Sequence, residues 1–197
     1  MKIDIILAGV GGQGILTIAA IIGTAALKNG LFLKQAETHG MSQRGGAVVS
    51  HLRISDAPIA SDLISMASAE VIISVEPMES LRYLPYLAQQ GYLITNSTVV
   101  DNILNYPDFS NLEAEISKIP HSLTLPADEI ASGIGNSRGS NLVMLGAASL
   151  VISISDVDFE KAIVACFAAK GEQLVIANLD AYRAGRKYAA AHLQLSA

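Results

Sequence analysis

A glycine-rich turn near the N-terminus constrains the fold of this chain more than any other feature of its sequence. The segment LAGVGGQGIL spans residues 7–16, contains the spacing Gly9-x-Gly11-x-x-Gly14 and follows the apolar run Ile3–Leu7. A strand, a glycine turn and a helix in this order open Rossmann-like folds, where the glycines permit a tight turn and let an anion approach the backbone. The pattern therefore predicts a central parallel strand followed by a helix whose N-terminus favours negative charge.

The rest of the chain alternates between strand-like and helix-like segments, and no repeat, low-complexity linker or charge run divides it. This alternation predicts an α/β fold: one Rossmann-like domain over residues 1–197, with a mainly parallel sheet flanked by helices and with C-terminal helices. From apolar periodicity and capping residues we expect strands at 3–7, 31–37, 47–55, 69–77, 92–98 and 121–128. We expect helices at 14–28, 61–68, 78–91 and 141–153, two more from Asp156 onward, and a short one within an irregular excursion at 99–120.

The composition favours a subunit that buries much of its surface against a partner. Apolar residues make up 51% of the chain and charged residues only 16%, whereas soluble proteins carry about a quarter charged residues. The most apolar run, Ile15–Leu27, is shorter than the roughly 20 residues of a membrane-spanning helix. The N-terminal residues MKIDIILAG do not match the pattern of a signal peptide. We therefore expect a cytoplasmic protein without a membrane span. The net charge of −5 and the lack of a basic stripe argue against binding to nucleic acid.

No residue pattern predicts catalysis or metal binding by this chain. Its one cysteine, Cys166, cannot hold an iron–sulfur cluster, a structural zinc or an internal disulfide, and we interpret it as a small buried side chain. His39 would suit acid–base chemistry, but a single loop histidine more commonly has a structural role, which we also expect for His51. His121 lies at the start of an expected strand, and no neighbouring residue indicates a partner for it. Nucleophile elbows, metal-ligand spacings and paired carboxylates are missing from the sequence, so we expect no catalytic and no metal-binding residue.

The ligand of the glycine turn stays open at this point. Glu37, 23 residues beyond the last glycine of the motif, would suit the ribose hydroxyl of a dinucleotide, so a stand-alone NAD(P)- or FAD-binding protein is one hypothesis. Two features argue against it. Gly12-Gln13 adds a glycine and a long amide to the turn, and Arg44 opens an Arg-Gly-Gly turn after the second expected strand. Arginine suits bidentate contact with a phosphate or carboxylate, and Arg44 would equally pair with a carboxylate at a subunit contact.

Three segments, taken in order, carry a family resemblance. GVGGQGILTIAAIIGTAALKNG is followed by QAETHGMSQRGGAVVSHLRIS and, at residues 135–147, by GNSRGSNLVMLGA. Together they resemble the gamma subunit or domain of the 2-oxoacid:ferredoxin oxidoreductases over about the whole chain. The phrase ETHGMSQRGGAVVSHLRI favours the indolepyruvate branch, since the 2-oxoglutarate and pyruvate branches usually carry other residues around the Arg-Gly-Gly turn. A gamma subunit of a 2-oxoglutarate or pyruvate enzyme is the alternative within the family.

The resemblance implies a subunit of an oxidoreductase that is inactive alone. The implied reaction is oxidative decarboxylation of an aryl pyruvate such as indolepyruvate, with coenzyme A, to an arylacetyl-CoA, CO2 and reduced ferredoxin. Thiamine diphosphate with its magnesium and the iron–sulfur clusters would lie on a large alpha subunit; this chain would pack on it and contribute to coenzyme A binding. By position, the resemblance implies that residues of the three segments line the ligand or subunit face: Gly9, Gly11, Gly12, Gln13, Gly14, Arg44, Gly45, Gly46, Asn136 and Asn141. A scaffold whose glycine turn binds nothing is the third hypothesis.

Overall fold

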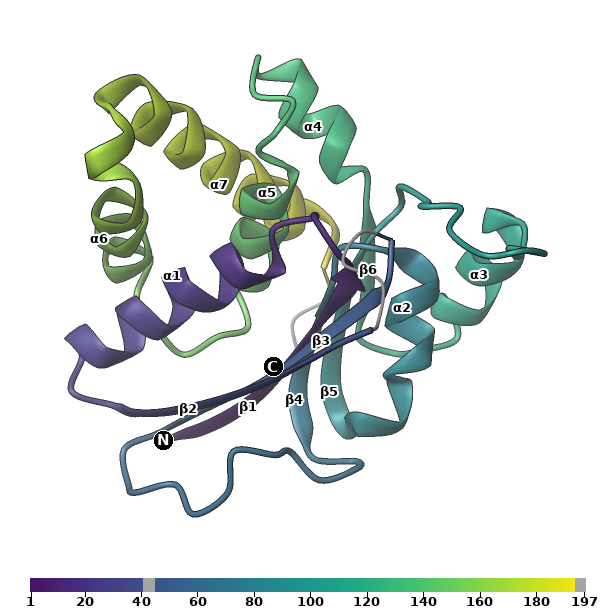
Figure 1. Ribbon diagram of the computed structural model, residues 1–197, viewed down its shortest axis with the longest axis horizontal. Coiled ribbons are helices and arrows are strands. Elements are labelled where there is room, and N and C mark those ends of the chain that lie inside the picture. Colours follow the sequence, from purple (N-terminus) through teal and green to yellow (C-terminus); the bar gives the residue numbers. More distant parts are fainter. Residues whose placement is uncertain (41–44, 194–197) are drawn as a thin grey trace.

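The computed structural model describes residues 1–40 and 45–193 and contains a six-stranded sheet with helices on both faces (Figure 1). The strands lie in the order β2-β3-β1-β4-β5-β6. They are β1 Lys2–Val10, β2 Phe32–His39, β3 Ala47–Ser55, β4 Ala69–Ser74, β5 Leu87–Asn96 and β6 Ser122–Leu125. The α/β class predicted from the sequence is confirmed.

The strand directions confirm a mainly parallel sheet, with one exception. β1, β4, β5 and β6 form successive parallel pairs, whereas β3 is antiparallel to both β1 and β2. β3 therefore runs against the other strands and lies between β1 and β2. The short link over residues 40–46 explains this arrangement, because a short connection joins antiparallel neighbours while a parallel neighbour needs a longer crossover.

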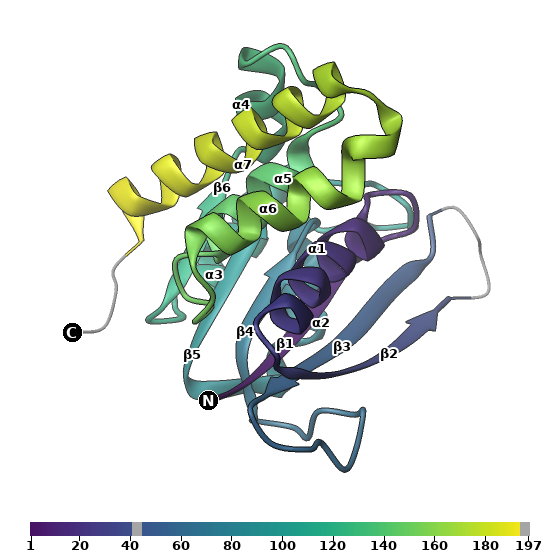
Figure 2. The ribbon, with the colours of Figure 1, turned by 90° about the vertical axis from the view of Figure 1, so that its left-hand side faces the viewer.

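The helices form unequal layers on the two faces of the sheet. They are α1 Ile15–Lys28, α2 Pro77–Arg82, α3 Phe109–Ile116, α4 Ala127–Gly133, α5 Ser140–Ala148, α6 Asp156–Phe167 and α7 Glu172–His192. α1 and α5 pack on one face with α6 and α7 outside them (Figure 2), while α2 and α3 cover the other face. β1 is consequently buried on both sides, with Ile5 and Leu7 in the larger core and Ile6 and Ala8 in the smaller one. None of the helices in the described part of the chain is long and apolar enough to cross a membrane.

α5 and α7 cross with their backbones in contact. A Cβ built on Gly146 of α5 would overlap the carbonyl oxygen of Tyr182 in α7, and one built on Gly185 of α7 would overlap that of Val143 in α5. Glycine leaves the room for this approach because it has no side chain. The Leu-Gly-Ala part of the third sequence segment therefore has a packing role, since it seats the long C-terminal helix on the layer that covers the sheet.

The helix predicted at 61–68 is wrong. Residues 56–68 form turns and bends between β3 and β4. Arg53 of β3 donates from Nη1 to the carbonyl oxygens of Ser61 (3.0 Å) and Leu63 (3.1 Å), while its Nε donates to the buried Asp4 (2.8 Å). Carbonyl groups that accept from a guanidinium in this way are turned away from the i→i+4 ladder of a helix.

The helix predicted at 78–91 is right only in its first half. α2 ends at Arg82, a 3-10 turn follows at Leu84–Tyr86, and β5 begins at Leu87, which pairs with β4. Pro85 stops the helix, because it lacks an amide hydrogen and disfavours helical backbone just before it. The other predicted strands and helices are confirmed, with ends shifted by a few residues.

Candidate functional site

The Gln13 side chain holds the glycine turn against the carboxyl ends of β1 and β4. Its Oε1 accepts from the amide of Val10 (2.7 Å), and its Nε2 donates to the carbonyl oxygen of Val75 (3.1 Å). Gly12 and Gly14 flank it with positive φ angles of 100° and 79°, in a region that other residues enter at a cost of about 1–2 kcal/mol. The extra glycine and the long amide of this turn therefore set its shape and lock it.

The end of the β2–β3 hairpin lies against the glycine turn. The amide of Gly11 donates to the carbonyl oxygen of Gly46 (2.9 Å). The side chain of Asn102, from the excursion after β5, donates to the carbonyl oxygen of Gly45 (2.6 Å). The structure thus brings together the glycine turn and two of the three residues of the Arg-Gly-Gly turn. Arg44, the third, lies outside the described residues.

Gly9 and the two asparagines of the third segment have separate roles. A Cβ on Gly9 would overlap the side chain at the end of β4, so this glycine permits close packing. Asn141, 9% exposed at the start of α5, donates to the carbonyl oxygen of Gly14 (3.4 Å) and so belongs to the turn. Asn136 instead donates to the carbonyl oxygen of Ala177 in α7 (3.0 Å). The structure therefore does not bring Asn136 to the glycine turn, and its place on the ligand or subunit face stays a prediction.

Two cavities open on either side of the glycine turn. The hairpin cavity, of about 620 Å³, is lined by Val10–Leu16, His39, Gly40 and Val48. The strand-end cavity, of about 420 Å³, is lined by Gly12–Gly14, Val75, Asn96, Thr98, Val100, Asp128, Arg138, Ser140, Asn141 and Met144. Gly12, Gln13 and Gly14 line both cavities, so the turn is a wall shared between them.

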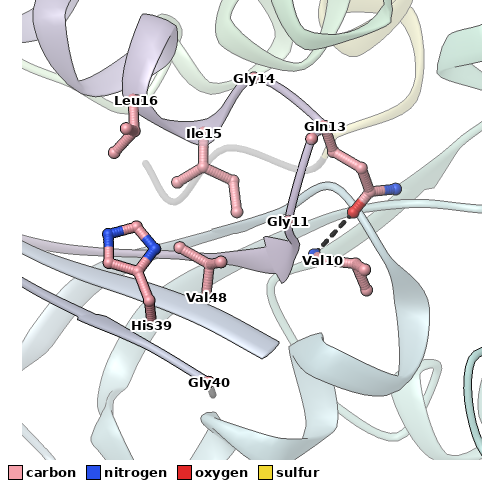
Figure 3. Close-up of a pocket in the computed structure, with 10 residues that line it drawn as sticks. Val10, Gly11, Gln13, Gly14, Ile15, Leu16, His39, Gly40 and Val48 are labelled. Carbon is pink, nitrogen blue, oxygen red and sulfur yellow. Dashed lines mark hydrogen bonds between the residues drawn. The ribbon is translucent and has the colours of Figure 1, made fainter. Parts of the chain in front are cut away.

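The hairpin cavity is mostly aliphatic. Ile15 and Leu16 at the start of α1 face Val48 of β3. The ring of His39 points from β2 into the same cavity, beside Val48 (Figure 3). His39 Nε2 lies 3.3 Å from Glu37 Oε2 on the same strand. Because most of its side chains are aliphatic, this cavity suits an apolar or weakly polar group better than a phosphate.

Glu37 does not take the place that an acidic residue has in a dinucleotide site. It lies on β2, which β3 separates from β1. Adjacent strands are about 4.8 Å apart, so the end of β2 lies two strand spacings from β1, whereas the acidic residue of a Rossmann site ends the strand next to β1. The insertion of β3 therefore removes the ribose contact on which the NAD(P) or FAD hypothesis depends.

The strand-end cavity lies where the connections of the sheet diverge. The chain leaves β1 toward β2 on one side and β4 toward β5 on the other, and open α/β sheets bind ligands at such a point. Asn96, 2% exposed at the end of β5, donates to the carboxylate of Asp128 (2.7 Å) and accepts from the amide of Ala127 (3.1 Å). Arg138 lines the same cavity, is exposed, and forms no ion pair with the residues that the structure describes.

Glu76, which no motif singles out, ties residues 97–106 to the sheet. Its carboxylate is fully buried; Oε2 accepts from the amide of Glu79 (2.8 Å) and Oε1 from the amide of Val100 (3.5 Å) and from the hydroxyl of Tyr106. Burial, together with the hydrogen bond to Glu76, raises the pKa of the Tyr106 hydroxyl. An acidic residue directly before a helix-starting proline is the signal that predicts such a cap. Because Val100 lines the strand-end cavity, Glu76 fixes part of its wall.

The chain is similar to known proteins over most of its length. Residues 4–188 match the family described as pyruvate ferredoxin/flavodoxin oxidoreductase. The chain belongs to this family. It is 39% identical to the indolepyruvate oxidoreductase subunit IorB of Archaeoglobus fulgidus over 74% of this chain and 75% of that protein. The IorB subunit of Methanothermobacter thermautotrophicus is 32% identical over 94% of this chain and 96% of its own length. The family resemblance of the sequence is thereby confirmed.

Solved structures share the fold of this member of the oxidoreductase family. A 2-oxoglutarate:ferredoxin oxidoreductase from Magnetococcus marinus, solved with 2-oxoglutarate, coenzyme A and succinyl-CoA bound, aligns with a TM-score of 0.78 at 22% identity. The alignment covers 96% of this chain but only 31% of that one. A pyruvate oxidoreductase subunit from Thermotoga maritima aligns with a TM-score of 0.73 at 23% identity, over 94% of this chain and 96% of its own.

The histidines and the cysteine of this family member have structural surroundings. His51 Nδ1 accepts from the amide of Ile64 (3.1 Å), and burial lowers its pKa although the charge of Asp62 acts in the opposite direction. The ring of His121 packs on an aromatic ring with centroids 5.1 Å apart, and Cys166 packs against the larger core. The contacts of His51 support the structural role predicted for it, whereas Cys166 is half-buried and not fully buried as predicted. Within residues 1–40 and 45–193, no group of three or more His, Cys, Asp or Glu side chains is placed to hold a metal ion.

Proposed function

We propose that this chain is the small subunit of a thiamine-diphosphate-dependent indolepyruvate:ferredoxin oxidoreductase and forms one gamma-type domain over residues 1–197. The enzyme would convert an aryl pyruvate and coenzyme A into an arylacetyl-CoA and CO2 while it reduces ferredoxin. The observation that carries the proposal is the similarity to IorB subunits, at 39% and 32% identity over most of both chains. The 2-oxoglutarate synthase subunit KorC of Methanothermobacter marburgensis is 29% identical, so the 2-oxoglutarate branch is the second candidate.

A larger alpha subunit is the proposed partner, and it would carry the redox cofactors. The residues of this chain do not fit an iron–sulfur cluster, because clusters need about four cysteine or histidine ligands and the sequence has one cysteine. Thiamine diphosphate with its magnesium, bound on the partner, supplies the decarboxylation chemistry. The electrons would reach ferredoxin through the complex. The low charge content of this chain supports a large buried interface with that partner.

The proposed contribution of this chain is a preformed wall for coenzyme A. Gln13 locks the glycine turn, and the amides of Gly12 and Gly14 have no acceptor among the described residues. Amides at such a turn favour an anion such as the diphosphate of coenzyme A. Asn141 stiffens the same turn from the side of α5. Arg44 stays a predicted contact to a phosphate or a carboxylate.

Co-expression of this chain with its large subunit tests the proposal. The purified complex should reduce ferredoxin when indolepyruvate and coenzyme A are both supplied, and the small subunit alone should not. Gly11→Val in the turn should raise the KM for coenzyme A, because a branched side chain would disturb the contact between Gly11 and Gly46.

The same assay separates the alternatives. Faster turnover of 2-oxoglutarate or pyruvate than of indolepyruvate would assign the chain to another branch of the family. Turnover of indolepyruvate by the isolated chain would contradict the proposed division between subunits. Tight binding of NAD(P) or FAD that is lost in Gly11→Val would support a stand-alone dinucleotide-binding protein instead.

A further inference from the structure

Two apolar side chains lie exposed at the tip of the excursion that follows β5. Leu104 is 95% exposed and its neighbour Ile103 is 45% exposed. The excursion, residues 97–108, leaves the carboxyl end of β5 and reaches the margin of the molecule beside α3 (Figure 1). A single exposed leucine is ordinary on a protein surface, so the indication of an interface comes from how the rest of the excursion holds this pair.

Hydrogen bonds on both sides of the tip fix its position. Before it, the side chain of Asn102 donates to the carbonyl oxygen of Gly45 in the hairpin (2.6 Å). After it, the hydroxyl of Tyr106 donates to the buried carboxylate of Glu76. Between these two anchors Asn105 has a φ angle of 64°, a left-handed conformation that residues other than glycine seldom adopt unless their surroundings impose it. The apolar pair is therefore presented in one conformation, and a preorganised contact loses little entropy when it binds.

The charged side chains next to the tip are acidic. Asp101 and Asp108 are exposed on either side of it, and Glu113 is exposed on α3, the helix that follows. The next cation along the sequence, Lys118, pairs with Glu115 (2.6 Å). Charges of opposite sign around an interface favour association and select the partner. A surface that receives this tip is therefore expected to have an apolar pocket with a basic rim.

The tip lies on the side of the molecule where the proposed function requires the large subunit. Thr98 and Val100 of the same excursion line the strand-end cavity, and Asn102 contacts the hairpin end beside the glycine turn. A subunit that completes this wall has to pass next to the tip. The fold of this chain also makes up only 31% of the Magnetococcus marinus chain. A fold that is one part of a longer chain there favours a larger partner here over a second copy.

We infer that Ile103 and Leu104 form a docking tip that inserts into an apolar pocket with a basic rim on the large subunit. The inference rests on the proposed function, in which this chain is the small subunit of a two-part enzyme. Asp101 and Asp108 face the rim, and Tyr106 is a positioning residue that holds the tip through Glu76. An apolar anchor inside a polar surround is the usual arrangement of the residues that dominate an interface. The docking tip sets how tightly the subunits associate and takes no part in the chemistry.

Dissociation of the co-expressed complex on dilution tests the docking tip. Mass photometry counts intact complexes and free subunits, in salt chosen so that the native complex dissociates within the accessible concentrations. We expect Leu104→Ala to raise the dissociation constant about tenfold, because burial of a leucine side chain is worth a factor of that order. Leu104→Asn should raise it about a hundredfold, because an amide without a partner then enters the apolar pocket.

Leu63→Asn is the matched control. Leu63 is 57% exposed in the loop 56–68. That loop follows β3, which is antiparallel to β1, and it leads into the start of β4. It therefore lies at the amino ends of the parallel strands, at the opposite edge of the sheet from the docking tip. The control should leave the dissociation constant unchanged.

Two further measurements separate docking from other roles of the excursion. With the complex fully assembled, Leu104→Asn should show the kcat of the native enzyme and its KM for coenzyme A, because the tip does not touch the ligand. Tyr106→Phe keeps the ring and removes the hydrogen bond to Glu76. It should raise the dissociation constant by a factor of about 2–10, the range for one hydrogen bond, although it leaves the apolar pair unchanged.

A dissociation constant that stays unchanged in Leu104→Asn, or rises equally in Leu63→Asn, would overturn the inference. An active native complex would then leave the proposed function standing. Association of two copies of this chain that Leu104→Asn weakens would also overturn it, since the tip would then bind a second copy. A complex that depends on Leu104 but does not oxidise indolepyruvate would remove the proposed function and leave the docking tip intact.

Discussion

Replacement of Gly14 by alanine tests how the glycine turn is built. The φ angle of 79° puts an alanine into the left-handed region, which costs about 1–2 kcal/mol. A Cβ there would also lie 2.5 Å from Nδ2 of Asn141, whose side chain is buried and bonded to the turn. Overpacking of this kind adds about 1–3 kcal/mol. We therefore expect Gly14→Ala to lower the free energy of unfolding by about 2–5 kcal/mol.

Gly12→Ala is the matched control for this experiment. Its φ angle of 100° is also positive, but a Cβ there would meet no atom within 4 Å, so only the backbone cost of about 1–2 kcal/mol applies. Urea unfolding followed by circular dichroism measures both losses, provided that the m-values stay equal. Asn141→Ala added to Gly14→Ala removes the overlap, and the double variant should lose about 1–3 kcal/mol less than the sum of the single losses. Equal losses at Gly12 and Gly14, or strict additivity with Asn141, would refute the packing argument.

Three further substitutions test burial and close packing. Burial raises the pKa of the Glu79 carboxyl, and the nearby Arg82 partly offsets this rise. The charged carboxylate therefore destabilises the folded protein increasingly as pH rises. Glu79→Gln should raise Tm near pH 7, and this gain should shrink toward about pH 4. Burial lowers the pKa of His51 from its usual 6.5. The unfolded chain therefore binds the proton more readily than the folded protein, and stability is lost as pH falls below that value. His51→Asn should make the decline of Tm between about pH 7 and pH 5 less steep. Gly146→Ala should cost about 3 kcal/mol in urea unfolding because it pushes α5 and α7 apart, whereas Gly133→Ala, with open space around its Cβ, should not destabilise the fold.

Features with local causes could be predicted from the sequence. The run Ile3–Leu7 lies within a strand buried on both faces, and α1 begins directly after the glycine turn and ends at Lys28. Apolar periodicity, glycine turns and helix caps act over a few neighbouring residues, so these elements can be predicted from a single sequence. The meeting of Gly11 with Gly46 does not follow from local signals, because it depends on the antiparallel pairing of β1 with β3, which joins distant parts of the chain.

Features that depend on distant residues could not be predicted in this way. The loop at 61–68 is not a helix because Arg53 takes up its carbonyl groups. Asn136 is held by α7 and not by the glycine turn, because the carbonyl oxygen of a residue 41 positions later accepts from its side chain. Arg138 stands in the same glycine-rich segment, and only the folded chain shows that it shares a cavity with Asp128. No spacing in the sequence connects these pairs.

The position of β3 explains why a motif typical of dinucleotide binding indicates a different ligand here. In a Rossmann site the neighbour of β1 ends in an acidic side chain that selects a ribose. Here the neighbour is β3, whose end brings a glycine carbonyl to the turn, and the acidic Glu37 lies one strand further out. The glycine turn is still expected to favour an anion, because that property comes from its own amides. Its selectivity has to come from the residues that replace the acidic strand end, and those belong to the hairpin on one side and to the start of α5 on the other. In the proposed function the same ten-residue segment binds a diphosphate, while the order of the strands decides which molecule carries it.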